Sequence, residues 1–123
     1  MTQEQKDLLL KDLCARLPYG VKVRYSSYEK FITCTLQAID YVYNNVDLWS
    51  KDACFNPVNI SKIKPYLFPL SSMTEEQKED MIKSSCGIGS DKNVFDWWNK
   101  NHFDYRSLIP MGLANDATGL NIY

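Results

Sequence analysis

Three residues with catalytic types of side chain stand close together in the segment HFDYR, residues 102–106. His102 could act as a general base, Asp104 could orient its ring, and Arg106 could clamp an anionic substrate. However, side chains two residues apart do not face each other once a helix begins. No Ser or Cys nucleophile is tied to these residues by sequence. The spacing therefore does not favour an enzyme built around His102, and no catalytic residue is expected.

A structural role accounts for the same segment more simply. The Asp104 carboxylate would accept backbone N–H bonds from the turn that follows it, as it would at a helix cap. Phe103 and Leu108 would pack against each other across that cap. His102 lies one turn after Trp98, so its ring would stack on the indole. We expect these structural roles.

Two adjacent tryptophans, Trp97 and Trp98, precede this segment. Neighbouring side chains on a helix point about 100° apart, so both indoles cannot bury against the same wall. One ring is therefore expected in the core and the other at the surface. Aromatic and Arg side chains dominate the energetics of protein interfaces. The pattern predicts a protein-binding surface that includes Trp97, Trp98, His102, Tyr105 and Arg106.

A second candidate surface combines basic and aromatic residues between positions 19 and 43. Its basic members are Lys22, Arg24 and Lys30, and its tyrosines are Tyr19, Tyr25, Tyr28, Tyr41 and Tyr43. Small barrels stack nucleic-acid bases on such faces. Tyrosine is also common in strands for packing alone, and the net charge of −1 gives no overall attraction to nucleic acid or anionic lipid. Nucleic-acid binding is therefore the alternative to protein binding.

The cysteines give no sign of a metal site. Cys14, Cys34, Cys54 and Cys86 form no CxxC pair, and the chain has one histidine, so zinc would need all four Cys or three with His102. The N-terminus is polar, unlike a secretory signal, and no segment is apolar enough to span a bilayer. We therefore expect a cytoplasmic protein with reduced thiols, no metal, no cofactor and no membrane contact.

Two helix starts carry the same signal. Thr2 and Gln5 stand in the T-x-x-Q spacing of a capping box, and so do Thr74 and Gln77. The likeness between MTQEQKDLLL and SSMTEEQKEDM ends within about a dozen letters, which is too short for a repeat unit. It therefore indicates two capped helices and carries no function.

The first helix is expected over residues 2–17, with Leu9, Leu13 and Leu17 as its buried stripe. Strand signals follow over residues 21–68. One strand changes phase at positions 38–39, which indicates a bulge.

The whole pattern predicts an α+β fold in one domain. A small antiparallel sheet of three to five strands, which could curl toward a barrel, would lie between the N-terminal helix and a helical region over residues 74–114. Residues 115–123 would form a loose polar tail.

Three blocks resemble recurrent segments of small uncharacterised proteins from prophage and mobile-element regions of gut-dwelling anaerobic bacteria. They are LLLKDLCARLPYGV (8–21), IKPYLFPLSSMTEEQKE (63–79) and DWWNKNHFDYRSLIPMGLA (96–114). Pro110 departs from this pattern and puts a continuous last helix in doubt. The resemblance implies a mobile-element setting and supplies no activity, substrate or catalytic residue.

These observations together predict a non-enzymatic accessory protein that acts by protein–protein contact. The mobile-element setting suits a host or defence component as its partner, and self-association is a further option. A small-barrel nucleic-acid-binding protein is the alternative.

Overall fold

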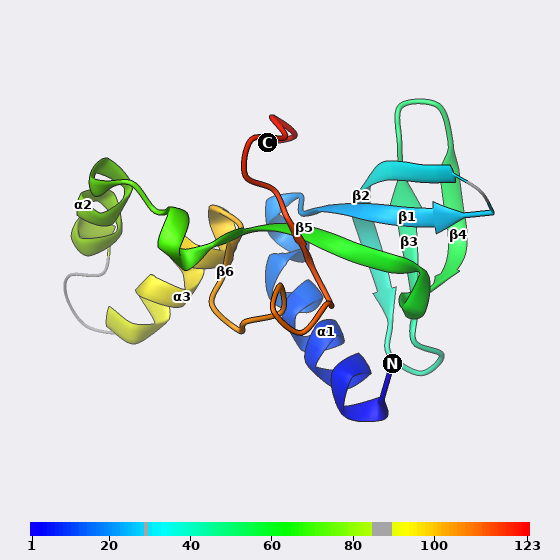
Figure 1. The fold of residues 1–123 in the computed structure, drawn as a ribbon. Coiled ribbons are helices and arrows are strands. Elements are labelled where there is room, and N and C mark those ends of the chain that lie inside the picture. The colour runs from blue at the N-terminus through cyan, green and yellow to red at the C-terminus, as the bar shows by residue number, and fades with distance from the viewer. Residues whose placement is uncertain (29, 85–89) are drawn as a thin grey trace.

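The chain forms an α+β fold, as predicted (Figure 1). The computed structural model describes residues 1–28, 30–84 and 90–123. Its helices are α1 (Gln3–Arg16), α2 (Glu75–Ser84) and α3 (Ser90–Lys100). Its longer strands are β1 (Lys22–Ser27), β2 (Lys30–Asp40), β3 (Asn45–Trp49), β4 (Cys54–Asn59) and β5 (Ile63–Pro69). Two strands of two residues each, β6 (Phe103–Asp104) and β7 (Asn115–Asp116), follow α3.

Both predicted capping boxes are confirmed. The Thr2 hydroxyl accepts a hydrogen bond from the Gln5 backbone N–H at 3.1 Å, and the Gln5 side chain accepts one from the Thr2 backbone N–H at 3.0 Å. Thr74 and Gln77 form the same pair of bonds, at 3.1 and 2.8 Å, in front of α2. Each box satisfies backbone donors that have no partner within the helix itself.

The sheet is open and mostly antiparallel. Its strand order is β4-β3-β2-β1-β5-β6, and β7 also pairs with β5. β6 and β7 run parallel to β5, whereas the first five strands pair antiparallel. The two short strands raise the number above the predicted three to five. A shift of register lies between Leu36 and Ala38, so the predicted bulge is present, slightly earlier than expected.

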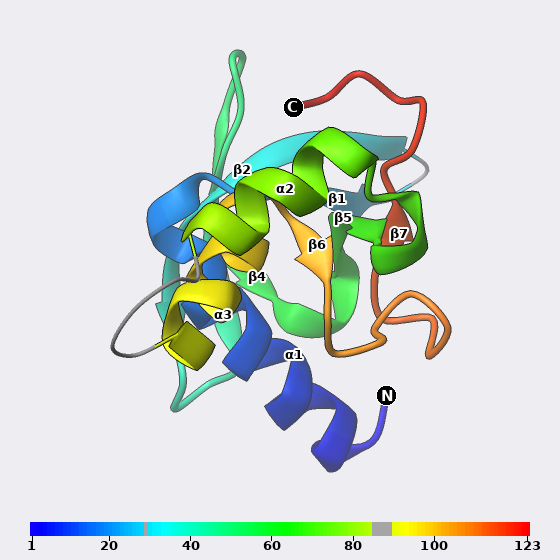
Figure 2. The ribbon, with the colours of Figure 1, turned by 90° about the vertical axis from the view of Figure 1, so that its left-hand side faces the viewer.

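Leucines of α1 and apolar residues of the sheet share one core. Leu9 and Leu13, two members of the predicted stripe, are fully buried, and they join a cluster with Val23, Leu36 and Ile63. Burying a leucine stabilises a fold by about 1.5–3 kcal/mol. The α1 helix and β5 lie in the middle of the molecule, with β1–β4 on one side and α2 and α3 on the other (Figure 1). Figure 2 views the molecule from the α2–α3 side.

The predicted helical region over 74–114 is wrong beyond Lys100, where α3 ends. Residues 101–114 form β6 and a series of turns instead. The backbone at His102 and Ser107 has positive φ, 63° and 59°, and a right-handed helix cannot continue through such residues. The letters GIGS at residues 87–90 predict a loop. Residues 87–89 lie outside the described part of the chain, and Ser90 is the first residue of α3.

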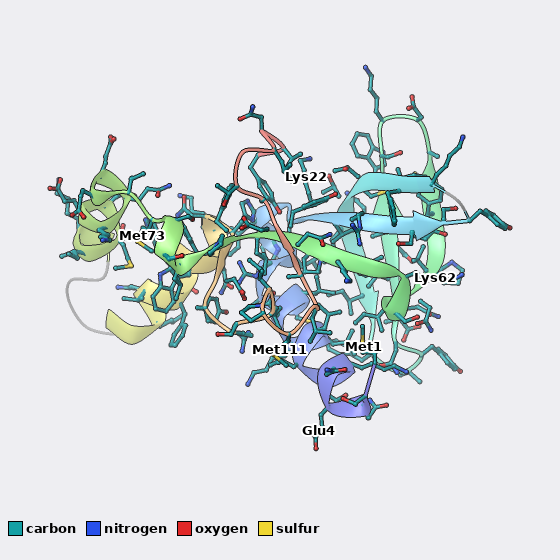
Figure 3. All side chains as sticks on the ribbon, in the orientation of Figure 1. Met1, Glu4, Lys22, Lys62, Met73 and Met111 are labelled. Carbon is teal, nitrogen blue, oxygen red and sulfur yellow. The ribbon has the colours of Figure 1, made fainter. Side chains whose placement is uncertain are left out.

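The C-terminal segment is fixed at several points, which corrects the expectation of a loose tail. β7 pairs with β5, and the Ala117 backbone N–H donates to the Leu67 carbonyl at 2.8 Å. The Tyr123 hydroxyl accepts from the Lys22 backbone N–H and donates to the Tyr66 carbonyl, each at 2.8 Å. It thereby bridges β1 and β5 just beyond their last paired residues. Figure 3 shows Lys22 beside the C-terminal segment.

Replacing Tyr123 by Phe tests this bridge. The variant keeps the ring but removes the hydroxyl, so the Lys22 N–H and the Tyr66 carbonyl lose their partner. We expect the free energy of unfolding to fall by about 1 kcal/mol, measured by urea denaturation. The control is Leu120→Ala, because Leu120 is half exposed in the same segment. Equal stability of wild type and Tyr123→Phe would show that the tail is not held through this hydroxyl.

Candidate functional site

Three aromatic rings form a cluster at the surface of α3 and the turn that follows β6. Phe95 and Trp98 stand three residues apart, so they share one side of the helix. Their ring centroids are 5.6 Å apart in an edge-to-face arrangement. The Tyr105 ring stacks on Trp98 at 5.4 Å and lies 5.3 Å from Phe95. Phe95 is 46% exposed, and the other two rings are partly buried. We call Phe95, Trp98, Tyr105 and Arg106 the aromatic cluster.

Arg106 and Asn99 fix the position of the Tyr105 ring. The Arg106 guanidinium lies 4.9 Å from the ring centroid, and its Nη2 donates to the Tyr105 hydroxyl at 3.1 Å. That hydroxyl donates in turn to Asn99 Oδ1 at 2.8 Å. The guanidinium–ring contact adds a cation–π attraction to these bonds. Tyr105 is therefore held on both its face and its edge.

A buried ion network anchors the cluster to α1. Asp12 accepts from Arg16 Nε at 2.8 Å through one carboxylate oxygen and from Arg106 Nε at 3.1 Å through the other. The side chains of Asp12 and Arg16 are fully buried. Arg16 Nη2 also donates to the Phe103 carbonyl at 2.6 Å. Buried charges are costly unless they are paired in this way, so the network holds Arg106 in one place.

Trp97 and His102 lie away from the cluster, in the interior. Trp97 is 7% exposed, stacks on Phe103 with ring centroids 5.6 Å apart, and donates its indole N–H to Asp80 at 2.8 Å. The prediction that one tryptophan is core and the other partly exposed is confirmed. The His102 ring stacks on Tyr123 at 3.7 Å, so the predicted stack on Trp98 is wrong. Burial and the nearby positive charge of Arg16 lower the pKa of His102 to about 4.

Asp104 has the structural role that the sequence predicts. Its carboxylate accepts the backbone N–H groups of Leu108 at 2.8 Å and Ile109 at 2.9 Å. Among the described residues, no hydrogen bond or salt bridge joins the His102 ring to Asp104 or Arg106, and Arg106 is engaged by Asp12. The three residues of the catalytic hypothesis thus have three separate sets of partners.

The cysteines and carboxylates form no ligand cluster in the described part of the chain. No three His, Cys, Asp or Glu side chains converge there as metal ligands would. Cys14, Cys34 and Cys54 are free thiols, and burial raises the pKa of Cys34. Cys86 lies outside the described residues.

Of the helices in 1–28, 30–84 and 90–123, none is long and apolar enough to cross a membrane.

Comparison with protein-family models, curated proteins and solved structures found no match to this chain. The function must therefore be inferred from the geometry of its own residues.

The three basic residues of the predicted nucleic-acid surface do not all lie together. Lys22 and Arg24 point to the same outer face of the sheet, because they stand two apart on β1. Lys30 lies at the end of the β1–β2 hairpin and lines a cleft of about 520 Å³ with Ser27, Tyr28 and Ile32.

The tyrosines predicted for this face lie elsewhere. Tyr25 packs edge-on against Phe55, with ring centroids 5.0 Å apart, and Tyr41 and Tyr43 lie in the turn after β2. Tyr19 belongs to the 3₁₀ turn after α1, and Tyr28 is fully exposed at the hairpin tip. The aromatic residues on the outer face of the sheet are therefore not the predicted tyrosines.

Sequence reasoning missed Phe95, Asp12 and Arg16. Phe95 could have been found from the sequence, because it stands three residues before Trp98 in a region predicted to be helical. Asp12 and Arg16 stand i, i+4 on α1, which is ordinary for a solvated pair, and nothing local indicates that both side chains are buried.

Proposed function

We propose that the protein is a cytoplasmic, non-enzymatic module that binds a protein partner through the aromatic cluster. The observation that carries this proposal is the fixed, partly exposed set of Phe95, Trp98 and Tyr105 beside Arg106. Aromatic and Arg side chains are the types that contribute most to interface energies. Rings that are already held in place lose little conformational freedom on binding, which favours affinity.

The resemblance of three sequence blocks to mobile-element proteins supports a host or defence component as the partner. The same cluster could also meet a second copy of the chain, since a two-fold contact brings identical surfaces together. These two partners differ in a measurable way. Self-association makes the mass of the purified protein depend on concentration, whereas a foreign partner does not.

Affinity capture from a nuclease-treated host lysate tests the proposal. The wild type should retain a partner at moderate salt, and Phe95→Ala should reduce the retained amount at least about tenfold, which corresponds to roughly 1.4 kcal/mol. The matched control is Tyr43→Ala, because Tyr43 is also an exposed aromatic residue and lies on the β2–β3 turn. Thermal unfolding of each variant separates lost binding from lost folding.

Two outcomes would contradict the proposal. One is a partner that survives Phe95→Ala but is lost with Tyr43→Ala, because binding would then use another surface. The other is the absence of any nuclease-resistant partner together with a mass that does not depend on concentration.

A further inference from the structure

The outer face of the sheet brings together residues that are distant in sequence. Strand register places Lys22 of β1 opposite Thr35 of β2, and Thr35 opposite Trp49 of β3. In the next row, Thr33 of β2, Arg24 of β1 and Lys64 of β5 stand side by side. Phe31 lies opposite Ser26 in the third row. We call these eight residues the outer sheet face.

Two side-chain contacts confirm that these rows share one face. The Arg24 guanidinium lies over the Phe31 ring, 4.4 Å from its centroid. Lys22 Nζ donates to Thr35 Oγ1 at 3.3 Å. The opposite side of the same strands carries Val23, Cys34 and other core residues, so the outer sheet face is the solvent side.

In the described part of the chain, no salt bridge involves the cations on this face. Within residues 1–28, 30–84 and 90–123, the salt bridges join Asp12 to two arginines and Glu75 to Lys78. None involves Lys22, Arg24 or Lys64. The outward residues of β1, β2 and β5 named above include no carboxylate, whereas α2 carries Glu75, Glu76, Glu79 and Asp80. The chain is nearly neutral overall, but its charges are separated. Asp47 of β3 stands two residues before Trp49 on the same side of the sheet, whereas the part of the face on β1 and β5 carries Lys22, Arg24 and Lys64 and is positive.

Two exposed aromatic rings stand beside the cations, on the neighbouring strands β2 and β3. Phe31 is 68% exposed and Trp49 is 49% exposed. Phe31 and Thr35, which pairs with Trp49, are four residues apart on β2, a separation of about 13 Å along the strand. Across the sheet the three cations, on β1 and β5, lie to one side of the two rings, on β3 and β2. The sugar–phosphate backbone of a single strand likewise runs along one side of its bases.

We propose that the outer sheet face binds single-stranded nucleic acid. Bases stack on Phe31 and Trp49, and Lys22, Arg24 and Lys64 neutralise the phosphates of the backbone that runs beside those bases. Unpaired bases expose the rings that stack on aromatic side chains, whereas a duplex hides them. A duplex reader would instead need a helix or ribbon placed in a groove. This inference uses different residues from the aromatic cluster and does not depend on the protein-binding proposal.

Fluorescence anisotropy with labelled dT10 and U10 oligonucleotides tests the electrostatic part. We expect binding of at least one probe at 50 mM salt. Three phosphate contacts give a slope of log K against log[salt] of about −2 for a single strand. The double variant Lys22→Glu with Arg24→Glu should bind at least about 100-fold more weakly. The matched control Lys11→Glu with Lys83→Glu makes the same charge change at exposed sites on α1 and α2, and it should bind within about threefold of wild type.

The aromatic part is tested by Phe31→Ala and Trp49→Ala. Each should weaken binding about tenfold, whereas Phe31→Tyr should preserve it, because base stacking requires an aromatic ring. Comparing dT10 with U10 distinguishes a DNA ligand from an RNA ligand, and a blunt duplex should bind more weakly than either. Near-ultraviolet circular dichroism verifies that each variant is folded.

Three results would overturn the proposal. The first is no binding of dT10 or U10 by the folded wild type. The second is an equal loss in the control charge variant, which would indicate unspecific attraction. The third is binding that is unchanged by both alanine variants.

Discussion

Asp12→Ala should destabilise the protein by about 3–5 kcal/mol, the largest effect we expect from any single substitution in α1. Asp12 accepts from Arg16 and Arg106, and the side chains of Asp12 and Arg16 are fully buried. Removing the carboxylate leaves the Arg16 charge in the interior without its partner. A loss of this size is a large share of the 5–15 kcal/mol that typical domains possess.

Urea denaturation of Asp12→Ala, Asp12→Asn and Asp7→Ala provides the measurement. Asp12→Asn keeps the shape and one acceptor but loses the charge, so its loss should lie between that of wild type and Asp12→Ala. Asp7 is exposed on the same helix and bonds only to Gln3 among the described contacts, so Asp7→Ala should cost less than about 0.5 kcal/mol. Similar stability of Asp12→Ala and Asp7→Ala would mean that the buried network does not hold the fold.

The free energy of unfolding should rise between pH 4 and pH 6.5 because of His102. The pKa of His102 is lowered to about 4 in the folded protein, from an ordinary value near 6.5 in the unfolded chain. Between these values the unfolded chain binds the proton and the folded protein does not, so lower pH favours unfolding. The contribution is fully present above pH 6.5 and is lost as the pH falls toward 4. The full shift corresponds to about 3 kcal/mol.

His102→Asn isolates this contribution. Asparagine does not titrate, and it tolerates the positive φ of 63° at this position. The chain has one histidine, so no other histidine titrates in the same range. The difference in unfolding free energy between wild type and His102→Asn, measured in urea from pH 4 to pH 7.5, should follow the His102 titration. Parallel pH profiles for the two proteins would contradict this assignment.

The conditions of the two binding experiments follow from these stability effects. Variants of the aromatic cluster and the outer sheet face are best compared above pH 6.5, where His102 does not weaken the fold. Loss of partner capture in Asp12→Ala would not by itself support the proposed function, because the whole fold is weakened. Phe95→Ala is the sharper test, since Phe95 is 46% exposed and is not part of the buried network.

The sequence by itself determined the features that depend on residues close together in the chain. The T-x-x-Q boxes at Thr2 and Thr74 form because donor and acceptor are three residues apart. Leu9 and Leu13 lie in the core because the helical period places them on one face. The bonds that Asp104 accepts from the backbone N–H groups of Leu108 and Ile109 are also local, because the partners are four and five residues apart.

Only the tertiary structure decided which distant residues meet. Arg106 reaches Asp12 across 94 positions, and the Tyr123 hydroxyl reaches Lys22 across 101. No short-range pattern encodes these contacts, because they depend on how α1, β5 and the C-terminal segment pack. The outer sheet face has the same origin. Strand alternation indicates that Lys22 and Arg24 share a side, but the register of β2, β3 and β5 brings Phe31, Trp49 and Lys64 beside them.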